Sequence, residues 1–492
     1  MSGKAKKATV CMLLAALMLS CACGSSDSGD EVTTTNNSES SESQTEETTE
    51  ADPLGSLRKV DFGGETYTII ARSDGSMSQL AGIELAVDEP NGELINDTIF
   101  NRNLKIEELY NCNIEVVTMP SSEVKSAVTS SVLAGDGAYN LVWTDMNSSS
   151  VMVASDTYAN FYDFDDIDLT QKWWNQNATE SLTVNGQCYL QLNYIPYSGM
   201  LFTHCIYYNK RLTDVYCDED LYGLVRDGKW TLDKFLEITA NGTADLNGDT
   251  VYDENDQYGF IASFGSTGIF TYSCDQDMVS VTDDGVAQID IVTDKMQTIV
   301  EKVNQLCYQD NRAYVNVTSY EPDMAKMFGN GQGVFYAGFL SDAMLYLRDM
   351  KDDYGLLPFP KFDEEQEHYY TSVSGGTGML GIPKVVADPE FTGLITEALA
   401  IESYDTVRPA VFETVMENKL LRDEDSVEMY ETLLDGIKIE FAVVYHGQNS
   451  YVPFTLWNLT QKNSTDLASY ASTYFKSAQA SYQKYVDLWY GK

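Results

Sequence analysis

The chain has 492 residues, of which 75 are acidic and 31 basic, so its formal net charge at pH 7 is −44 and its pI is close to 4.1. This balance argues against nucleic acid and anionic lipid surfaces as partners, because their phosphate groups would be repelled. The hydrophobic fraction of 43% is typical of globular proteins, and the length suits two large domains or three small ones.

The N-terminus is typical of an exported protein. Three lysines precede an apolar run over residues 10–20, which is too short to span a bilayer but suits a secretory signal. The run ends at Ser20-Cys21-Ala22-Cys23-Gly24, which resembles the lipobox of bacterial lipoproteins. This resemblance implies a signal peptide over residues 1–22 and a lipid (palmitate-type) anchor on Cys23, with Cys21 as the alternative, on the extracytoplasmic face of the cell membrane.

The next segment, residues 23–56, is predicted to be a disordered acidic stalk. From Gly24 to Asp52 it consists almost entirely of Ser, Thr, Asp, Glu, Asn, Gln and Gly, and Val32 is its only sizeable apolar side chain. Such a composition cannot bury enough apolar surface to offset the entropy lost on folding.

After the stalk, strand and helix patterns alternate. Apolar strand patterns occupy residues 67–71, 113–119 and 139–143, and helical spacing occupies 96–110 and 121–133. This βαβαβ order predicts an α/β fold with a parallel sheet and right-handed crossovers.

Ligands of such sheets bind beyond the carboxyl ends of the strands. This rule makes Trp143, Asp145 and Asn147 candidate ligand-binding residues at the end of the third strand. The alternative is that Trp143 is a core residue and Asp145 caps the following helix.

Several short motifs follow in a characteristic order. A Trp-Trp-Asn sequence at residues 173–175 precedes a predicted hairpin with an Asn-Gly turn at 182–189, and Tyr208-Asn209-Lys210 precedes Trp230-Thr231 and a helix. Residues 354–360 and 378–389 complete the series. In order and spacing, these motifs resemble the family 1 extracellular solute-binding proteins, which are receptors of ABC importers related to maltose-binding protein.

The resemblance implies a two-lobed, periplasmic-binding-protein-like (type II) fold with an interlobe cleft and a hinge. We expect lobe 1 to span residues 57–200 and 375–435, and lobe 2 to span 201–374 and 436–492. The resemblance also implies that Phe339 and Trp457 are aromatic residues of the solute site. The expected function is that of a monomeric receptor, not an enzyme, that passes a carbohydrate to the subunits of an ABC permease.

One loop has the spacing of a calcium site. Oxygen-bearing side chains and one carbonyl recur at the positions of an EF-hand loop, although position 6 is Thr250 rather than Gly and position 12 is Asp rather than Glu. The alternative is an acidic, solvated turn. The candidate ligands of a structural calcium ion are Asp245, Asn247, Asp249, Val251, Asp253 and Asp256.

Other sequence features discriminate less well between a receptor and an enzyme. No GxSxG, HExxH or Walker motif is present, and carboxylates are too common for a pair to identify a glycosidase. The alternatives to a receptor are a surface-anchored polysaccharide-degrading enzyme and a non-transport adhesion lipoprotein.

Six cysteines beyond the signal region are expected to be mostly free and buried. At the C-terminal end, the pattern predicts an extended segment at residues 451–457 and helices at 391–403, 406–419, 426–436 and 464–490.

Overall fold

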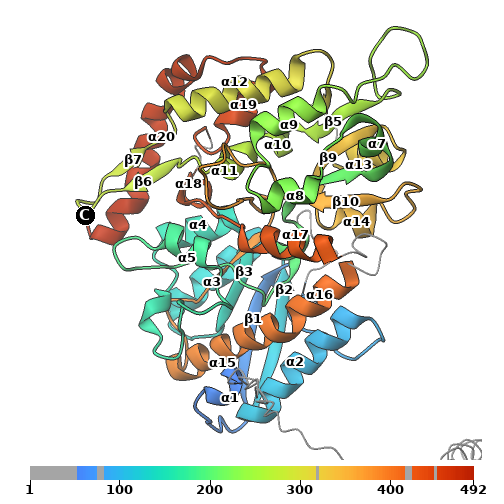
Figure 1. Cartoon of the computed structure of the whole chain (residues 1–492). Helices are drawn as coiled ribbons and strands as arrows, with labels where there is room; N and C mark the ends of the chain where they lie inside the picture. Colours follow the sequence, from blue (N-terminus) through green and yellow to red (C-terminus); the bar gives the residue numbers. More distant parts are fainter. Residues whose placement is uncertain (1–51, 75–81, 317–320, 416–423, 448–450) are drawn as a thin grey trace, which may run out of the picture. The chain divides into compact units, whose positions relative to one another are not determined.

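The computed structural model describes residues 52–74, 82–316, 321–415, 424–447 and 451–492. The signal peptide, the two candidate lipidation cysteines and residues 23–51 of the stalk therefore lie outside the described residues. The strands form a four-stranded sheet, a five-stranded sheet and a two-stranded ribbon (Figure 1).

The four-stranded sheet contains the predicted βαβαβ unit. Its strand order is β11-β3-β1-β2, and β1 pairs in parallel with both β2 and β3, which confirms the prediction. β11 closes one edge by pairing antiparallel with β3. The strands are β1 (Glu65–Arg72), β2 (Cys112–Met119), β3 (Leu141–Asp145) and β11 (Gly378–Gly381).

The five-stranded sheet mixes parallel and antiparallel pairs. Its order is β10-β4-β9-β5-β8, in which β5 is parallel to β8 and β9, while β4 is antiparallel to β9 and β10. Every residue of β4, β5 and β9 is buried, as expected for strands that are covered on both faces. The strands are β4 (His204–Asn209), β5 (Tyr258–Ser263), β8 (Ala313–Asn316), β9 (Gly333–Phe339) and β10 (Tyr354–Leu357), and the ribbon is β6 (Val279–Val281) with β7 (Ala287–Ile289).

Helices connect and cover these strands. Those of the first half are α1 (Pro53–Ser56), α2 (Leu94–Tyr110), α3 (Ser121–Ala134), α4 (Met146–Ala154), α5 (Gln176–Leu182), α6 (Ser198–Leu201), α7 (Lys210–Tyr216), α8 (Leu221–Arg226), α9 (Leu232–Thr239), α10 (Phe264–Thr267) and α11 (Phe270–Ser273). Those of the second half are α12 (Asp294–Tyr308), α13 (Glu321–Gly329), α14 (Asp342–Leu345), α15 (Pro389–Glu402), α16 (Arg408–Val415), α17 (Glu424–Asp435), α18 (Phe441–Val444), α19 (Thr455–Gln461) and α20 (Leu467–Tyr490). Two short helices of other types are η2 (Phe161–Asp163) and the π-helix η3 (Ser403–Val407).

The chain passes between the two large sheets in three segments, and these segments lie side by side. Thr203 pairs with Val373, and Thr371 pairs with Ile437. Backbone hydrogen bonds join them, including His204 N to Ser372 O at 3.0 Å and Lys438 N to Thr371 O at 2.9 Å. The prediction of a two-lobed fold with a hinge is confirmed, whereas the exact lobe boundaries stay a prediction.

The Trp-Trp motif has a structural explanation. The indole nitrogens of Trp173 and Trp174 donate to the two carboxylate oxygens of Glu397 on α15, at 2.7 and 3.0 Å. Glu397 is only 1% exposed, and burial raises its pKa to about 7 although the two indole bonds act in the opposite direction. Because the two hydrogen bonds come from consecutive residues, they fix the segment before α5 against α15.

Two segments differ from the sequence-based expectation. Residues 451–457, predicted as extended, form a turn followed by α19, because Val452, Leu456 and Leu459 recur at helical spacing and are buried together. Residues 53–56 were assigned to the stalk, but they form α1, and Leu54 is buried at 3% exposure. Ordered structure therefore begins no later than Pro53.

The cysteines and the helices agree with a folded domain that has no disulfide in its described part. Cys112, Cys188, Cys205, Cys274 and Cys307 are free and buried, and Cys217 is free and half-buried. In the described ranges, no helix combines the length and the apolar composition that crossing a bilayer requires.

The buried Glu397 predicts a specific pH dependence of stability. Its pKa is about 7 in the folded state and near 4.5 when unfolded, so between these values folding takes up a proton. The free energy of unfolding should therefore fall as the pH rises from about 4.5 to about 7, by up to roughly 3 kcal/mol from this group. Urea unfolding across this range should show the fall in the wild type and a flatter curve in Glu397→Gln, with Glu108→Gln as the exposed control. Parallel curves for wild type and Glu397→Gln would contradict the assignment.

Candidate functional site

The carboxyl ends of β1 and β3 bring charged side chains together at one edge of the four-stranded sheet. β1 ends at Arg72 and β3 ends at Asp145, and the register pairs Ala71 with Trp143. Arg72 is 6% exposed, and its guanidinium donates to the carbonyl of Gly376. Burial lowers the pKa of Arg72, and the charges of Asp145 and Glu84 oppose that shift. A buried cation thus lies at this edge, where the charges of these carboxylates favour its charged form.

Trp143 is part of the core that supports this edge. It is 2% exposed, and its indole nitrogen donates to Glu84 at 2.9 Å, while the other oxygen of Glu84 accepts from Ser198 N at 3.1 Å. A Cβ added at Gly378 would lie 2.8 Å from the Trp143 ring, so β11 covers the ring closely. The arrangement agrees with the alternative that Trp143 is a core residue, and it gives the ring little surface for stacking.

The residues after Trp143 alternate between exposure and burial. Asp145 is half-buried and caps α4, since its Oδ1 accepts from Ser148 N at 2.9 Å. Asn147 is exposed, whereas Met146 between them is 5% exposed. Asp145 therefore has a structural role as a helix cap, and its second oxygen accepts from Thr144 Oγ1 at 3.4 Å.

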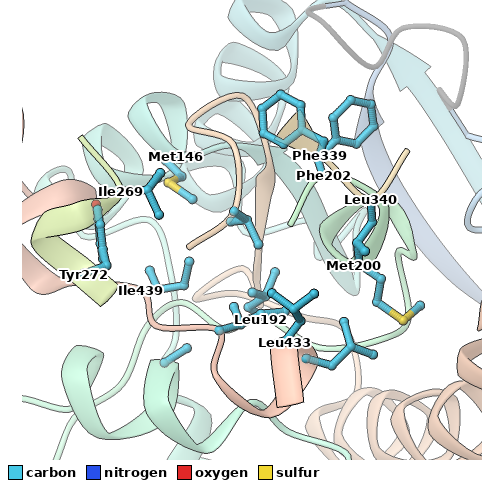
Figure 2. Close-up of a cluster of buried hydrophobic side chains, with 14 of the residues drawn as sticks. Met146, Leu192, Met200, Phe202, Ile269, Tyr272, Phe339, Leu340, Leu433 and Ile439 are labelled. Carbon is cyan, nitrogen blue, oxygen red and sulfur yellow. The ribbon is translucent and has the colours of Figure 1, made fainter. Parts of the chain in front are cut away.

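Met146 belongs to an apolar cluster that joins the ends of both sheets. Figure 2 shows Met146 with Ile269, Tyr272 and Ile439, and shows Phe202 with Phe339. The Phe339 ring lies 5.8 Å from that of Phe202 and 4.3 Å from that of His204. The labelled members, all less than 10% exposed, are Met146, Leu192, Met200, Phe202, Ile269, Tyr272, Phe339, Leu340, Leu433 and Ile439.

The two aromatic residues implied by the resemblance differ in exposure. Phe339 is 7% exposed at the end of β9, inside the apolar cluster. Trp457 on α19 is 36% exposed, and its ring meets that of Phe454 edge-on at 5.4 Å. A Cβ added at Gly268, the neighbour of Ile269, would lie 3.8 Å from the Trp457 Cβ. Phe339 thus belongs to the apolar cluster and Trp143 and Asp145 to the charged edge, while Trp457 lies on α19 and packs against Phe454.

Sequence reasoning missed several members of this region. Arg72 and Glu84 are not among the predicted site residues. Arg72 is a charged residue at the end of an apolar strand, and this pattern could have indicated the edge of the sheet. Met146, Phe202 and Ile269 were not selected, because each is an ordinary apolar residue in its own segment. Only the meeting of the two sheets places them together (Figure 2).

The predicted calcium loop has a compact backbone. Thr250 takes the left-handed conformation, with φ of 65°, at the position where an EF-hand loop has Gly. The two carboxylate oxygens of Asp245 accept from Gly248 N at 2.6 Å and from Thr250 N at 2.9 Å. Asp256 is fully buried and accepts from Leu246 N and Asp253 N at 2.9 and 3.0 Å. Within the described ranges, however, no three His, Cys, Asp or Glu side chains converge as a metal site would require.

Comparison with known proteins relates this architecture to binding proteins. Residues 105–394 match the model of a family described as bacterial extracellular solute-binding protein. No match was found among curated proteins.

Solved structures share the fold at low sequence identity. A solute-binding protein of an ABC transporter from Thermotoga lettingae, bound to α-D-tagatose, has a TM-score of 0.51 and 16% identity, covering 86% of this chain and 100% of its own. The GacH receptor of Streptomyces glaucescens, solved with acarbose, has a TM-score of 0.52 and 11% identity, covering 85% and 99%. UspC of M. tuberculosis has a TM-score of 0.51 and 13% identity, covering 85% and 100%.

The two tryptophans of this region predict different costs of substitution. Trp143→Phe removes a donor from the buried carboxylate of Glu84, so it should lower the free energy of unfolding by about 1–3 kcal/mol. Trp457→Phe changes a partly exposed ring and should cost less than about 0.5 kcal/mol. Urea unfolding of both variants measures the difference, and equal effects would show that the bond to Glu84 does not support the edge.

Proposed function

Because the chain belongs to the family of bacterial extracellular solute-binding proteins, we propose that it is the receptor of an ABC importer and that its solute is a carbohydrate. Members of this family work outside the cytoplasm as binding proteins, not as enzymes. We further propose that a lipid on Cys23, or alternatively on Cys21, anchors the chain to the outer face of the cell membrane. The receptor would act as a monomer and deliver its solute to permease subunits.

The observation that carries the carbohydrate proposal is the combination of groups at the sheet edges. A sugar needs rings or apolar side chains against its faces, and carboxylates or amides for its hydroxyls. Asp145 and Asn147 offer the polar groups, and the partly exposed Trp457 offers a ring, whereas Phe339 is buried in the apolar cluster. Two proteins of the same fold were solved with α-D-tagatose and with acarbose, which supports extending this solute class to the present chain.

The hinge segments supply a mechanism for recognition. A solute that contacts residues from both sheets would stabilise the arrangement in which their ends meet, and the permease would recognise that arrangement. The differential affinity of the solute for the two arrangements sets how far the population shifts. Sugar contacts on only one sheet would give binding without closure.

The solute role of Asp145 can be separated from its capping role. Asp145→Ser keeps an N-cap oxygen, so the melting temperature should change little, while loss of the carboxylate should weaken sugar binding by about 2 kcal/mol, roughly thirtyfold. A thermal-shift screen with an oligosaccharide panel identifies the sugar, and calorimetry then compares wild type, Asp145→Ser and Trp457→Ala. The Trp457 variant should lose a similar amount through lost contact area. If both variants bind like wild type, the solute site lies elsewhere.

We also propose that the loop over residues 245–256 binds a structural calcium ion. The left-handed turn at Thr250 and the oxygen spacing support this proposal, although the carboxylates are hydrogen-bonded to backbone amides of the loop. The residues that would hold the ion are Asp245, Asn247, Asp249, Val251, Asp253 and Asp256.

Metal removal tests this loop. A chelator should lower the melting temperature of the wild type, and Asp249→Ala should remove that sensitivity. Thr250→Gly is a matched variant, because it relieves a β-branched residue at positive φ and should raise stability by up to about 1 kcal/mol with the chelator response retained. An unchanged melt in chelator, together with no metal in elemental analysis, would rule out the ion.

The anchor can be tested in cells. Cys23→Ala should release the protein into the medium or the soluble extracytoplasmic fraction, whereas Cys21→Ala should leave it in the membrane fraction. Mass spectrometry of the mature N-terminus should show a diacylglycerol-modified Cys23. Modification of Cys21 instead would reverse the assignment, and an unmodified N-terminus near Met1 would refute export.

A further inference from the structure

A polar cavity of about 630 Å³ lies apart from the predicted solute residues. One wall is α5 with the Asn-Gly turn that follows it, and the other wall is β6 of the β6–β7 ribbon with the residues that flank it, Asp277 and Asp283. The floor is the segment from Lys438 to Phe441, and Tyr490 at the end of α20 completes the lining. Figure 1 shows the ribbon lying against α20, whose Gln483 donates to Gly285 O and accepts from Ala287 N at 2.9 and 3.0 Å. The volume is in the range of small-molecule sites.

The cavity has a defined floor and mouth. Glu440 is 5% exposed and Phe441 is 3% exposed, so both lie at the floor. Tyr370 and Tyr490 are half-buried at the sides, and the carboxylates of Glu180, Asp277 and Asp283 are exposed at the mouth. Consecutive residues of the floor segment face opposite ways, because Ile439 belongs to the apolar cluster while Lys438 and Glu440 line the cavity (Figure 2).

Several hydrogen-bond donors of the lining are already engaged by the protein. The Lys438 ammonium lies 3.0 Å from both Asp275 and Glu440, and it lies 5.4 Å above the Tyr370 ring. The Asn177 amide donates to the carbonyls of Asp435 and Ile437, at 3.0 and 3.1 Å. Asn185 donates to Trp489 O at 2.8 Å, and the Tyr490 hydroxyl donates to Thr282 O at 3.2 Å.

The lining therefore offers mainly acceptors to an occupant. Four carboxylates, those of Glu180, Asp277, Asp283 and Glu440, face a single ammonium group, which is itself neutralised by its carboxylate partners. The Tyr370 ring already holds the Lys438 ammonium at 5.4 Å and the Tyr490 ring holds that of Lys492 at 5.2 Å, so the attraction for a cation comes from the carboxylates. An occupant must donate hydrogen bonds and gains from a positive charge, whereas a carboxylate or phosphate would be repelled.

We propose that this cavity is a second ligand site, which binds an amine-bearing cationic solute such as an aminated sugar. The site uses none of the residues assigned to the carbohydrate, so it does not rest on the proposed function. It draws residues from segments on both sides of the three connecting strands, and an occupant would contact α5 and the ribbon together. The exposed carboxylates at the mouth attract the cation.

The test uses two probes of matched shape. The β-1,4-linked trimer of glucosamine carries ammonium groups at pH 6.5, whereas its N-acetylated counterpart is neutral. Calorimetry should detect binding of the glucosamine trimer, weakened by added NaCl, and at least tenfold weaker binding of the neutral trimer to the same cavity. The double variant Glu180→Gln/Asp283→Asn removes one exposed carboxylate from each wall and should weaken binding of the amine by about tenfold.

Two controls separate this site from the proposed sugar site. Glu108→Gln/Asp214→Asn makes the same charge change at exposed positions elsewhere and should leave the affinity for the amine unchanged. Asp145→Ser should likewise leave it unchanged, while the cavity variant should not alter binding of a neutral sugar. No detectable binding of the glucosamine trimer, equal affinity for both trimers, or an unchanged affinity in the cavity variant would overturn the proposal without affecting the carbohydrate assignment.

Discussion

The pairing of three connecting segments governs how the two sheets of this protein can act together. Thr203 pairs with Val373 and Thr371 pairs with Ile437, so the backbone crosses between the sheets as a small hydrogen-bonded ladder. Such a ladder can keep its own hydrogen bonds while the backbone dihedral angles of the flanking residues change slightly. It can therefore allow rotation of one sheet relative to the other without exposing backbone polar groups. The same ladder places the ends of β3 and β9, and thus Met146 and Phe339, in one neighbourhood.

That neighbourhood contains two kinds of surface with different physical roles. The apolar cluster around Met146, Phe202, Ile269 and Phe339 contributes contact area that is not directional, so it can hold the sheets together but cannot select a solute (Figure 2). The charged edge around Arg72, Glu84 and Asp145 is directional, because each group has defined partners. Selection of a solute in this region would therefore depend on the polar edge and on the exposed ring of Trp457, while the apolar cluster would set the cost of separating the sheets.

Buried carboxylates recur in this protein, and each has a specific set of donors. Glu397 receives two indole N–H groups, Glu84 receives one indole and one backbone N–H, and Glu440 pairs with Lys438. Burial raises the pKa of all three carboxyl groups, so the contribution of each to the free energy of unfolding depends on pH. In an acidic chain such as this one, Trp143, Trp173 and Trp174 have a structural role, because their N–H groups satisfy buried carboxylates without adding charge.

The sequence by itself determined much of the local structure and the family. The βαβαβ unit and the Asn-Gly turn depend on periodicity and on turn residues, which act within a few positions of one another. Tertiary structure decided the rest, because it depends on contacts between residues far apart in the chain. It turned Tyr451–Trp457 from an expected extended segment into a turn and helix, since Val452, Leu456 and Leu459 had a core to enter. It made Trp143 a donor to Glu84, 59 residues earlier in the chain. It also brought Lys438 beside Asp275, although 163 residues separate these two. Short-range patterns cannot specify such pairs, because the two partners meet only when the chain has closed around both sheets.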